Sequence, residues 1–225
     1  MQNLFNSQSS SELARYKKWR KIGMKFNHQI MDQTPKDALL RAAADLRLLR
    51  KKDDIIRFDS ETDTHFLMDR LVHDVLIDGK RDVEIFRAQN AQRLTDDERT
   101  LLDALVDSRY SLFIIQKIQP GQGLHLFDVF SEEKTFLTDV YLSQTAIEGN
   151  LLAARAVSVD GITFTSGCAC PFPAERLQPL KDNFIQLFEK KKHQMTWAEM
   201  MRQYNPHFFI AMKRLGAEID FMDVI

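Results

Sequence analysis

The sequence lacks the features that identify several large classes of protein. No run of about 18 apolar residues without charges occurs, so a membrane-spanning helix is not expected. The N-terminal stretch MQNLFNSQSSSELARYKKWRK has no apolar core followed by a small-residue cleavage site, so we expect no secretory signal. These absences lead us to expect a protein of the cytoplasm with no membrane partner.

Cysteine is scarce, with only Cys168 and Cys170 in 225 residues. With one residue between them, the two thiols cannot staple distant segments of the chain. We expect both in a Gly/Pro-rich loop after the last strand, as small buried thiols. The alternative is a metal or redox pair, although the spacing is not the CxxC of familiar redox motifs. A four-ligand zinc site would need two more ligands, such as His193 or His207.

Familiar catalytic motifs are also missing. The sequence contains no GxSxG, HExxH or Walker pattern. Gly121-Gln122-Gly123 has no third glycine, no Lys-Ser/Thr and no following helix, so it is a turn rather than a phosphate loop. We expect no cofactor. The missing motifs favour a protein that is not an enzyme, but they do not exclude catalysis.

Helical periodicity dominates both ends of the chain. Apolar residues recur three or four apart, and capping signals such as Thr95 with Glu98 and Thr196 with Glu199 mark helix starts. Residues 1–10 are polar and small, which is typical of a frayed tail. The pattern predicts helices over about 11–30, 35–52, 61–79, 80–92, 96–107, 177–192 and 197–215, and leaves the apolar, acidic tail 217–225 over.

The centre of the chain is different, because short apolar runs there are separated by turn residues. Strands are predicted over about 110–118, 124–130, 134–140, 151–158 and 161–166. Several of these strands are apolar on both faces, so both faces need a cover, and the flanking helices are available to provide it. The fold class is therefore α+β: a small five-strand curled sheet or barrel flanked by N-terminal and C-terminal helices. We divide the chain into a helical N-terminal region (residues 1–107), a β-rich core (residues 108–173) and a helical C-terminal region (residues 174–225), which together form one compact unit.

Charge is unevenly distributed although the net charge is −1. Residues 1–52 carry 12 Lys/Arg against 4 Asp/Glu, a net of +8, and residues 53–107 carry 7 against 15, a net of −8. The two segments are either helical neighbours whose charges face each other, or the first is a surface for an anionic partner.

The most basic stretch is a predicted amphipathic helix with interleaved aromatic residues. Its apolar stripe is typical of a helix packed on a core, with lysines that keep it soluble. The alternative is nucleic-acid or anion binding, in which an aromatic side chain assists the cations. The candidate residues are Arg15, Lys17, Lys18, Trp19, Arg20, Lys21 and Lys25.

Several segments resemble an uncharacterised family of bacterial proteins over most of the chain. They are RYKKWRK (15–21), FDS (58–60), LMDRLVHD (67–74), RYSLF (109–113), LFDVF (126–130), LLAARAV (151–157) and TSGCACPFP (165–173). The central region is also similar to a region of some SEC-C-motif proteins, but the cysteine-rich SEC-C tail is absent. The resemblance implies a bacterial intracellular protein and carries no catalytic residues over to this chain.

His65, Asp69 and His73 lie four residues apart and share one face of a predicted helix. Imidazole and carboxylate groups on one face are plausible metal ligands. Eight residues span about 12 Å of helix, so all three cannot meet one ion. The alternative is a solvated polar face on an acidic helix.

Arg155 and Asp128 are charged residues on apolar strand faces. Arg155 shares its face with Leu151, Val157 and Val159, and Asp128 shares its face with Leu124 and Leu126. An unpaired guanidinium in a core would cost several kcal/mol, so we expect a structural ion pair between Arg155 and a carboxylate. The alternative is an anion site at a barrel mouth, which Arg109 would join.

Three hypotheses about function follow. The first is a non-enzymatic binding or adaptor protein that contacts a partner protein through the basic N-terminal helix or the C-terminal helices. The second is nucleic-acid binding by the basic helix. The third is a metal-dependent enzyme built on the histidines or the cysteine pair.

Overall fold

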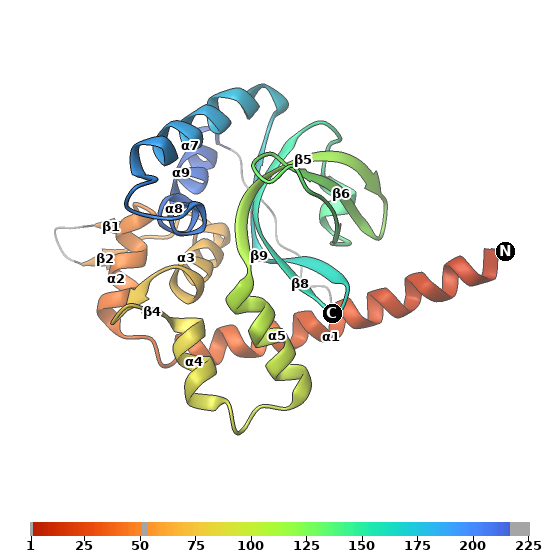
Figure 1. The fold of residues 1–225 in the computed structure, drawn as a ribbon, viewed down its shortest axis with the longest axis horizontal. Helices are drawn as coiled ribbons and strands as arrows, with labels where there is room; N and C mark the ends of the chain where they lie inside the picture. Colours follow the sequence, from red (N-terminus) through yellow and green to blue (C-terminus); the bar gives the residue numbers. More distant parts are fainter. Residues whose placement is uncertain (1, 51–53, 217–225) are drawn as a thin grey trace.

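The computed structural model describes the chain over residues 2–50 and 54–216, with side chains from Ser11 onward. A closed five-strand barrel lies at the centre, and helices from both ends of the chain cover it (Figure 1). The predicted α+β fold is thereby confirmed. None of the helices in these ranges has the length and apolar character needed to cross a membrane.

The N-terminal region is helical, with two short hairpins inserted. Helix α1 runs across the lower half of the molecule, and α4 and α5 lie next to it and extend below it (Figure 1). The helices are α1 (Gln2–Met31), α2 (Lys36–Asp45), α3 (Glu61–His73), α4 (Asp82–Asn90) and α5 (Asp96–Asp107). The hairpins pair β1 (Leu49–Arg50) with β2 (Ile55–Ile56), and β3 (Leu76–Ile77) with β4 (Lys80–Arg81).

The barrel strands are joined in the order β5-β6-β7-β9-β8. All neighbours are antiparallel except β7 and β9, which are parallel where Leu137 lies opposite Thr163. The strands are β5 (Arg109–Gln119), β6 (Gly123–Asp128), β7 (Lys134–Thr138), β8 (Leu151–Val159) and β9 (Ile162–Phe172). Closure leaves none of these five strands at an edge, which removes the usual template for aggregation.

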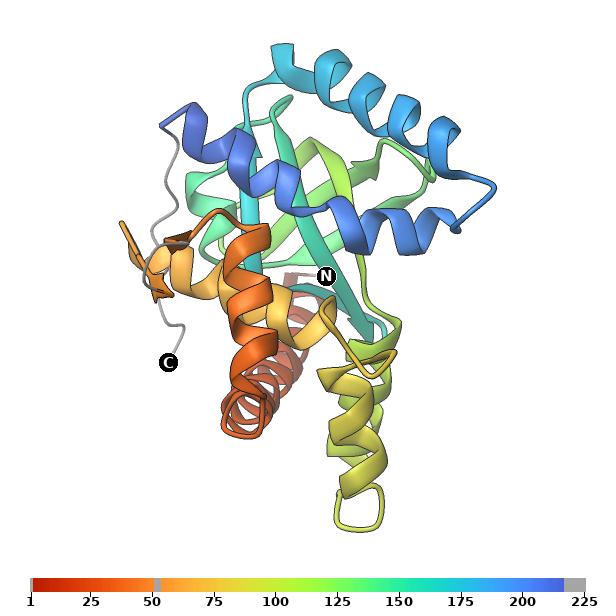
Figure 2. The ribbon, with the colours of Figure 1, turned by 90° about the vertical axis from the view of Figure 1, so that its left-hand side faces the viewer.

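The C-terminal region returns over the barrel. The short helix η1 (Ala174–Arg176) leads into α7 (Leu177–Lys191), which is followed by α8 (Trp197–Tyr204) and α9 (Pro206–Arg214). Together with α2 and α3 these helices bury the outward residues of β5, β8 and β9, among them Tyr110, Leu112 and Phe172. Figure 2 shows α2, α3 and the C-terminal helices stacked against the same side of the barrel.

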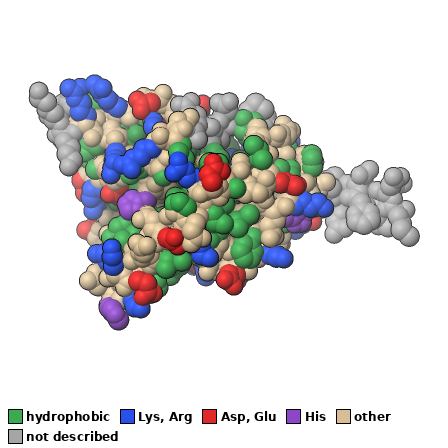
Figure 3. Space-filling model, turned by 90° about the horizontal axis from the view of Figure 1, so that it is seen from above, with side chains coloured by type: hydrophobic (Ala, Val, Ile, Leu, Met, Phe, Trp, Pro, Cys, Tyr) green, Lys and Arg blue, Asp and Glu red, His purple; other side chains and the backbone are tan. Residues whose placement is uncertain are grey.

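A second cluster covers the outer surface at the hairpin end of β8 and β9. Tyr16, Trp19, Phe26 and Ile30 of α1 pack with α4, α5 and the hairpin end of β8 and β9. The inside of the barrel holds a third cluster of its own. On the face seen in Figure 3, acidic and basic side chains are interspersed with hydrophobic ones.

Several predicted boundaries are wrong. Helix α1 begins at Gln2 rather than Ser11, because polar residues can continue a helix that the apolar pattern does not mark. Helix α2 ends at Asp45 rather than near Lys52, and Leu49–Arg50 forms a strand. Lys51 and Lys52 lie outside the described residues, as does the tail 217–225.

The end of α3 and the cysteine segment also differ from the prediction. Helix α3 stops at His73, and Gly79 is the second central residue of the tight turn between β3 and β4. Asp78 and Gly79 have φ of 50° and 80°, as an Asp-Gly hairpin turn requires. Cys168 and Cys170 lie within β9, not in a loop after it.

Candidate functional site

The five strands meet at a polar barrel mouth, which is the end of the barrel next to α5. Strands β5, β7 and β9 begin at this end, and β6 and β8 finish there. A cavity of about 500 Å³ opens at the mouth. Its inward-facing residues are Arg109, Ser111, Phe113, Asp128, Thr135, Ala156, Ser158 and Thr163, and the C-terminal turn of α5 adds Asp107 and Ser108.

The cavity has a floor because the rest of the barrel interior is filled. Strand side chains alternate in direction, and the inward residues beyond Phe113 are apolar: Ile115, Leu124, Leu126, Leu137, Leu152, Ala154 and Ala169. At the far end the short helix α6 (Leu142–Thr145) packs Leu142 against this cluster. The barrel therefore has the form of a cup. Apolar side chains close one end, and the other end is open and lined by polar residues.

Asp128 is held rigidly at the polar end. Its Oδ1 accepts hydrogen bonds from the Ser111 hydroxyl at 2.8 Å, from the Phe130 amide at 2.8 Å and from the Ser131 amide at 3.1 Å. No hydrogen bond to Oδ2 is found within the described stretches of the chain. One oxygen is thus committed to the fold, and the other is placed as an acceptor at the cavity.

The rest of the mouth carries charges of both signs and several hydroxyl groups. Arg109 and Lys134 are exposed cations, and Asp107 and Glu133 are exposed anions. The Ser158 and Thr163 hydroxyls lie 2.8 Å apart across the β8–β9 pair. Such a mixture suits a small molecule with hydrogen-bonding groups of both kinds better than a simple anion.

Arg155 lies on the opposite face of β8, outside the barrel and beneath α3. Its guanidinium is 0% exposed. Nε donates to both oxygens of Asp69 at 3.1 and 3.2 Å, and Nη2 donates to Asp69 at 3.1 Å and to Asp74. Arg155 therefore has two carboxylates, neither of which is Asp128, and it is not at the barrel mouth.

The same buried network extends to the C-terminal helices. Asn205, at the junction of α8 and α9, donates to Asp74 at 2.8 Å. Ser166 donates to Asp69, and it lies in an irregularity of β9 where residues 166–168 face the single residue Arg155. The extra residues bring the Ser166 hydroxyl to the ion pair. The network thus links the N-terminal helices, the barrel and the C-terminal helices.

Electrostatics act differently on the two carboxylates, because burial raises the pKa of Asp74 although the Arg155 and Arg70 charges oppose the shift. Burial alone would raise the pKa of Asp69, but the Arg155 charge and its hydrogen bonds outweigh this and lower it. Burial, followed by the nearby Arg155 charge, lowers the pKa of His73 to about 3, although Asp69 opposes the shift. His73 is therefore neutral at physiological pH.

The metal-ligand candidates are not gathered into one site. Within the described residues, no group of three or more His, Cys, Asp or Glu side chains is arranged to hold a metal ion. Asp69 is engaged by Arg155, and His73 is fully buried with Nε2 4.0 Å from Asp69. His65 is half-buried on the same helix. The sequence offers a solvated polar face as the alternative to a metal site. This face is largely inside the protein instead, because Asp69 and His73 are buried.

The two cysteines are buried free thiols on the outer face of β9. Burial raises the pKa of Cys168 well above its usual value, and it raises that of Cys170 as well. The Tyr110 hydroxyl lies 3.7 Å from the Cys170 sulfur. Because the thiolate is the reactive form and the metal ligand, this environment opposes both roles.

Several basic residues of α1 form ion pairs or hydrogen bonds with other elements of the fold. Lys18 pairs with Asp97 at 2.6 Å, Lys25 with Glu98 at 2.5 Å and Arg15 with Asp160 at 3.4 Å. Arg20 donates to the Thr165 carbonyl at 3.4 Å, and Lys17 and Lys21 are exposed. Trp19 is 3% exposed and packs in the core. The basic and acidic segments are indeed helical neighbours, and the tryptophan is not available for stacking on a base.

Sequence reasoning does not find most of the barrel mouth. Of its inward-facing residues only Asp128 and Arg109 are candidates from the sequence. Ser111, Thr135, Ser158 and Thr163 are ordinary strand residues, and only a known strand register shows that they converge. A usable signal is the change from apolar to polar inward positions along β5, from Phe113 to Ser111 and Arg109.

Comparison with known proteins identifies a family. A family model described as a family of unknown function (DUF7986) matches residues 10–221. No curated protein and no solved structure matches.

Proposed function

The chain belongs to the family of unknown function DUF7986, and we propose that it is a non-enzymatic binding protein whose barrel mouth receives a small polar molecule. The observation that carries this proposal is the cup form of the barrel. One end is packed with apolar side chains, and the other holds a cavity of about 500 Å³. The mouths of β-barrels are common binding sites for small ligands, and this volume lies in the usual range.

The chemistry of the mouth restricts the ligand. Asp128 offers Oδ2 as a fixed acceptor, so the ligand presents an ammonium or hydroxyl donor to it. Arg109 and Lys134 can accept a carboxylate or other anionic group at the rim, and Phe113 supplies an apolar floor. A free amino acid or another small molecule with both donor and acceptor groups fits this pattern.

Substitution of Asp128 by asparagine tests the proposal with little risk to the fold. The asparagine oxygen can still accept the hydrogen bonds from Ser111, Phe130 and Ser131, while an NH₂ donor replaces Oδ2. Loss of a charge-assisted hydrogen bond of about 1.5–3 kcal/mol weakens binding by roughly tenfold or more.

Binding would be screened with amino acids, nucleosides and sugars by ligand-observed NMR and thermal shift. The expected result is one ligand class that binds the wild type and is lost in Asp128→Asn. A second variant, Ser158→Tyr, would fill the mouth and block the same ligand. The control Asp37→Asn removes an exposed carboxylate of α2 and should bind normally. A ligand that binds all four proteins equally, or no ligand at all, would refute the proposal.

The other expectations from the sequence have less support or stay predictions. Nucleic-acid binding by α1 has fewer free cations than the sequence suggests, because Arg15, Lys18 and Lys25 face carboxylates. Contact with a partner protein, bacterial origin and the SEC-C likeness of the central region stay predictions. Cytoplasmic residence is supported by the two unpaired thiols.

A further inference from the structure

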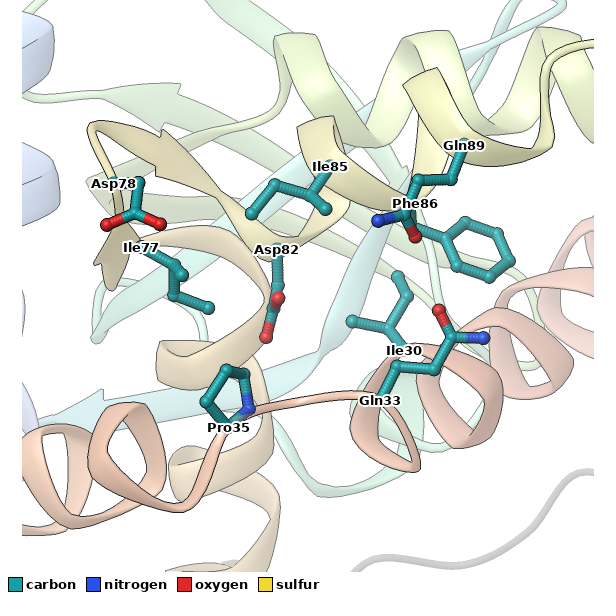
Figure 4. A pocket seen from close by; sticks show the side chains of 9 residues that line it. All are labelled: Ile30, Gln33, Pro35, Ile77, Asp78, Asp82, Ile85, Phe86 and Gln89. Carbon is teal, nitrogen blue, oxygen red and sulfur yellow. The ribbon is translucent and has the colours of Figure 1, made fainter.

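A second cavity lies away from the barrel, where the connection between α1 and α2 meets α4. Its volume is about 310 Å³. Figure 4 shows Ile30, Ile77 and Phe86 around it, with the Asp82 carboxylate directed between Ile30 and Ile77 toward Pro35. Asp78, in the turn between β3 and β4, lies at one side. The lining thus combines apolar walls with two acidic groups and the amides of Gln33 and Gln89, and none of the described residues that form it is a cation.

Asp82 is unusual among the buried carboxylates of the described chain. Asp63, Asp69 and Asp74 are also buried, and each has a cation: Lys213 lies 2.8 Å from Asp63, and Arg155 contacts Asp69 and Asp74. Asp82 is 6% exposed, yet no Lys, Arg or His nitrogen of the described residues lies within 4.0 Å of its oxygens. Its neighbour Arg81 is directed to Glu84 instead, at 2.8 Å.

Asp82 has one side-chain partner, the Thr34 hydroxyl, which compensates only weakly for the missing cation. The Thr34 hydroxyl lies 2.5 Å from Asp82 Oδ2 and 3.0 Å from the Ile30 carbonyl. A hydroxyl has one proton, so it can donate fully to only one of these two acceptors. Burial raises the pKa of Asp82, although the Thr34 hydrogen bond opposes the shift. The first turn of α4 stabilises the anion only modestly.

A buried carboxylate without a counter-ion is costly unless something supplies the positive charge. We propose that the cavity beside Asp82 binds an aliphatic ammonium group, with Asp82 as its counter-ion and Ile30, Ile77 and Phe86 around the attached carbon chain. Asp78 adds a second negative charge at the rim. This inference concerns a different cavity from the barrel mouth and does not depend on that proposal.

Other ligand classes fit less well. Two carboxylates and no lining cation exclude an anion. A calcium or magnesium ion takes six or more oxygen ligands, whereas only two of the nine lining residues are carboxylates and five are apolar. A neutral apolar molecule would leave Asp82 without a counter-ion. The ammonium belongs either to a free alkylamine or to a lysine side chain of a peptide, and these two sources share the same chemistry.

The test compares three probes on the full chain by isothermal titration and thermal shift at neutral pH. Pentylamine supplies the ammonium and chain, pentanol is its neutral counterpart, and Nα-acetyl-lysine methylamide represents a lysine in a peptide. We expect pentylamine to bind and to raise the melting temperature, and pentanol to bind at least tenfold more weakly. Binding of the lysine derivative as well as pentylamine would assign a peptide lysine, and binding of pentylamine alone would assign a free amine.

The variant Asp82→Asn should weaken pentylamine binding by about 30-fold or more. Asparagine can still accept from Thr34 and removes the uncompensated charge, so the unliganded variant should melt at the same temperature as the wild type or above it. Asp182→Asn is the control, because Asp182 lies on α7 and accepts a hydrogen bond from Gln178. No pentylamine binding to folded wild type, equal binding of pentanol, or undiminished binding to Asp82→Asn would overturn the proposal.

Discussion

Arg155 on β8 and Asp69 on α3 form a buried ion pair between the barrel and the helical layer. Three hydrogen bonds of 3.1 to 3.2 Å join the two side chains, and both are almost fully excluded from water. The pair fixes α3 in register on the barrel, because a planar guanidinium accepts few orientations of its carboxylate partner. Asp74 joins the same guanidinium and connects it to Asn205.

Replacing Arg155 by leucine should be strongly destabilising. The substitution leaves Asp69 and Asp74 buried without their main cation, and removal of one partner from a buried ion pair costs about 3–5 kcal/mol. Urea unfolding followed by circular dichroism would measure the loss. Arg155→Lys should also destabilise, because one ammonium group cannot reproduce the forked contacts to two carboxylates.

A triple variant tests whether the loss of stability comes from unpaired charge or from lost packing. In it, apolar residues of similar volume replace Arg155, Asp69 and Asp74. Such replacements in other proteins are often neutral or stabilising, so the triple variant should recover much of the stability lost by Arg155→Leu. A free energy of unfolding of Arg155→Leu within about 1 kcal/mol of the wild-type value would lie below the range expected for buried pairs. It would show that Arg155 does not stabilise the packing of α3 on the barrel.

His73 predicts a pH dependence of stability. Its pKa falls from an unfolded value of 6.5 to about 3 because of burial, so between these pH values the unfolded chain binds the proton and the folded chain does not. Stability therefore decreases as the pH falls below 6.5, by up to about 1.4 kcal/mol per pH unit.

The variant His73→Gln removes this contribution. Its free energy of unfolding, measured between about pH 7.5 and about pH 4, should depend less on pH than that of the wild type. His28 is exposed on α1, and His28→Gln is the matched control for the loss of a surface histidine. Parallel pH profiles for the wild type and His73→Gln would show that His73 titrates normally in the folded protein.

The sequence predicts the general plan because local signals and the global fold agree. Turn residues divide the centre into strands, and strands apolar on both faces require helices around them. The boundaries that are wrong lie where two signals compete. Gly79 suits a helix end as well as an Asp-Gly hairpin, and only the pairing of Leu76 with Arg81 decides between them.

Partners of charged residues are beyond the reach of the sequence. Strand alternation places Arg155 on an apolar face, but its carboxylates come from α3 and from the residue that follows it, more than 80 residues earlier. The Asp82 cavity is formed by three separate segments, and Thr34, which precedes the start of α2, contacts Asp82 instead of capping that helix. Tertiary contacts of this kind leave no periodic trace.

The exposed ion pair between α1 and α5 should contribute little to stability. Lys18 and Asp97 are 2.6 Å apart, but both side chains are about half exposed. Exposed pairs of this kind contribute about 0.2–1 kcal/mol and are weakened by salt. A double-mutant cycle with Lys18→Ala and Asp97→Ala, measured at low and high salt, should give a coupling in this range that falls with salt. A coupling above about 2 kcal/mol, well outside the range for exposed pairs, would contradict this expectation.

Two glycines should respond to alanine substitution with opposite signs. A Cβ at Gly123 would lie 2.0 Å from the Leu137 carbonyl oxygen of β7, so Gly123→Ala forces apart the β6–β7 pair and should cost about 3 kcal/mol or more. Gly23 lies inside helix α1, and a Cβ there would meet only Leu101 of α5 at 3.9 Å, an ordinary contact. Gly23→Ala should therefore stabilise the protein by about 0.5–1 kcal/mol through helix propensity.

Thermal and urea unfolding of both variants would measure the two effects. Equal effects of the two substitutions would contradict the close approach of β6 and β7 at Gly123.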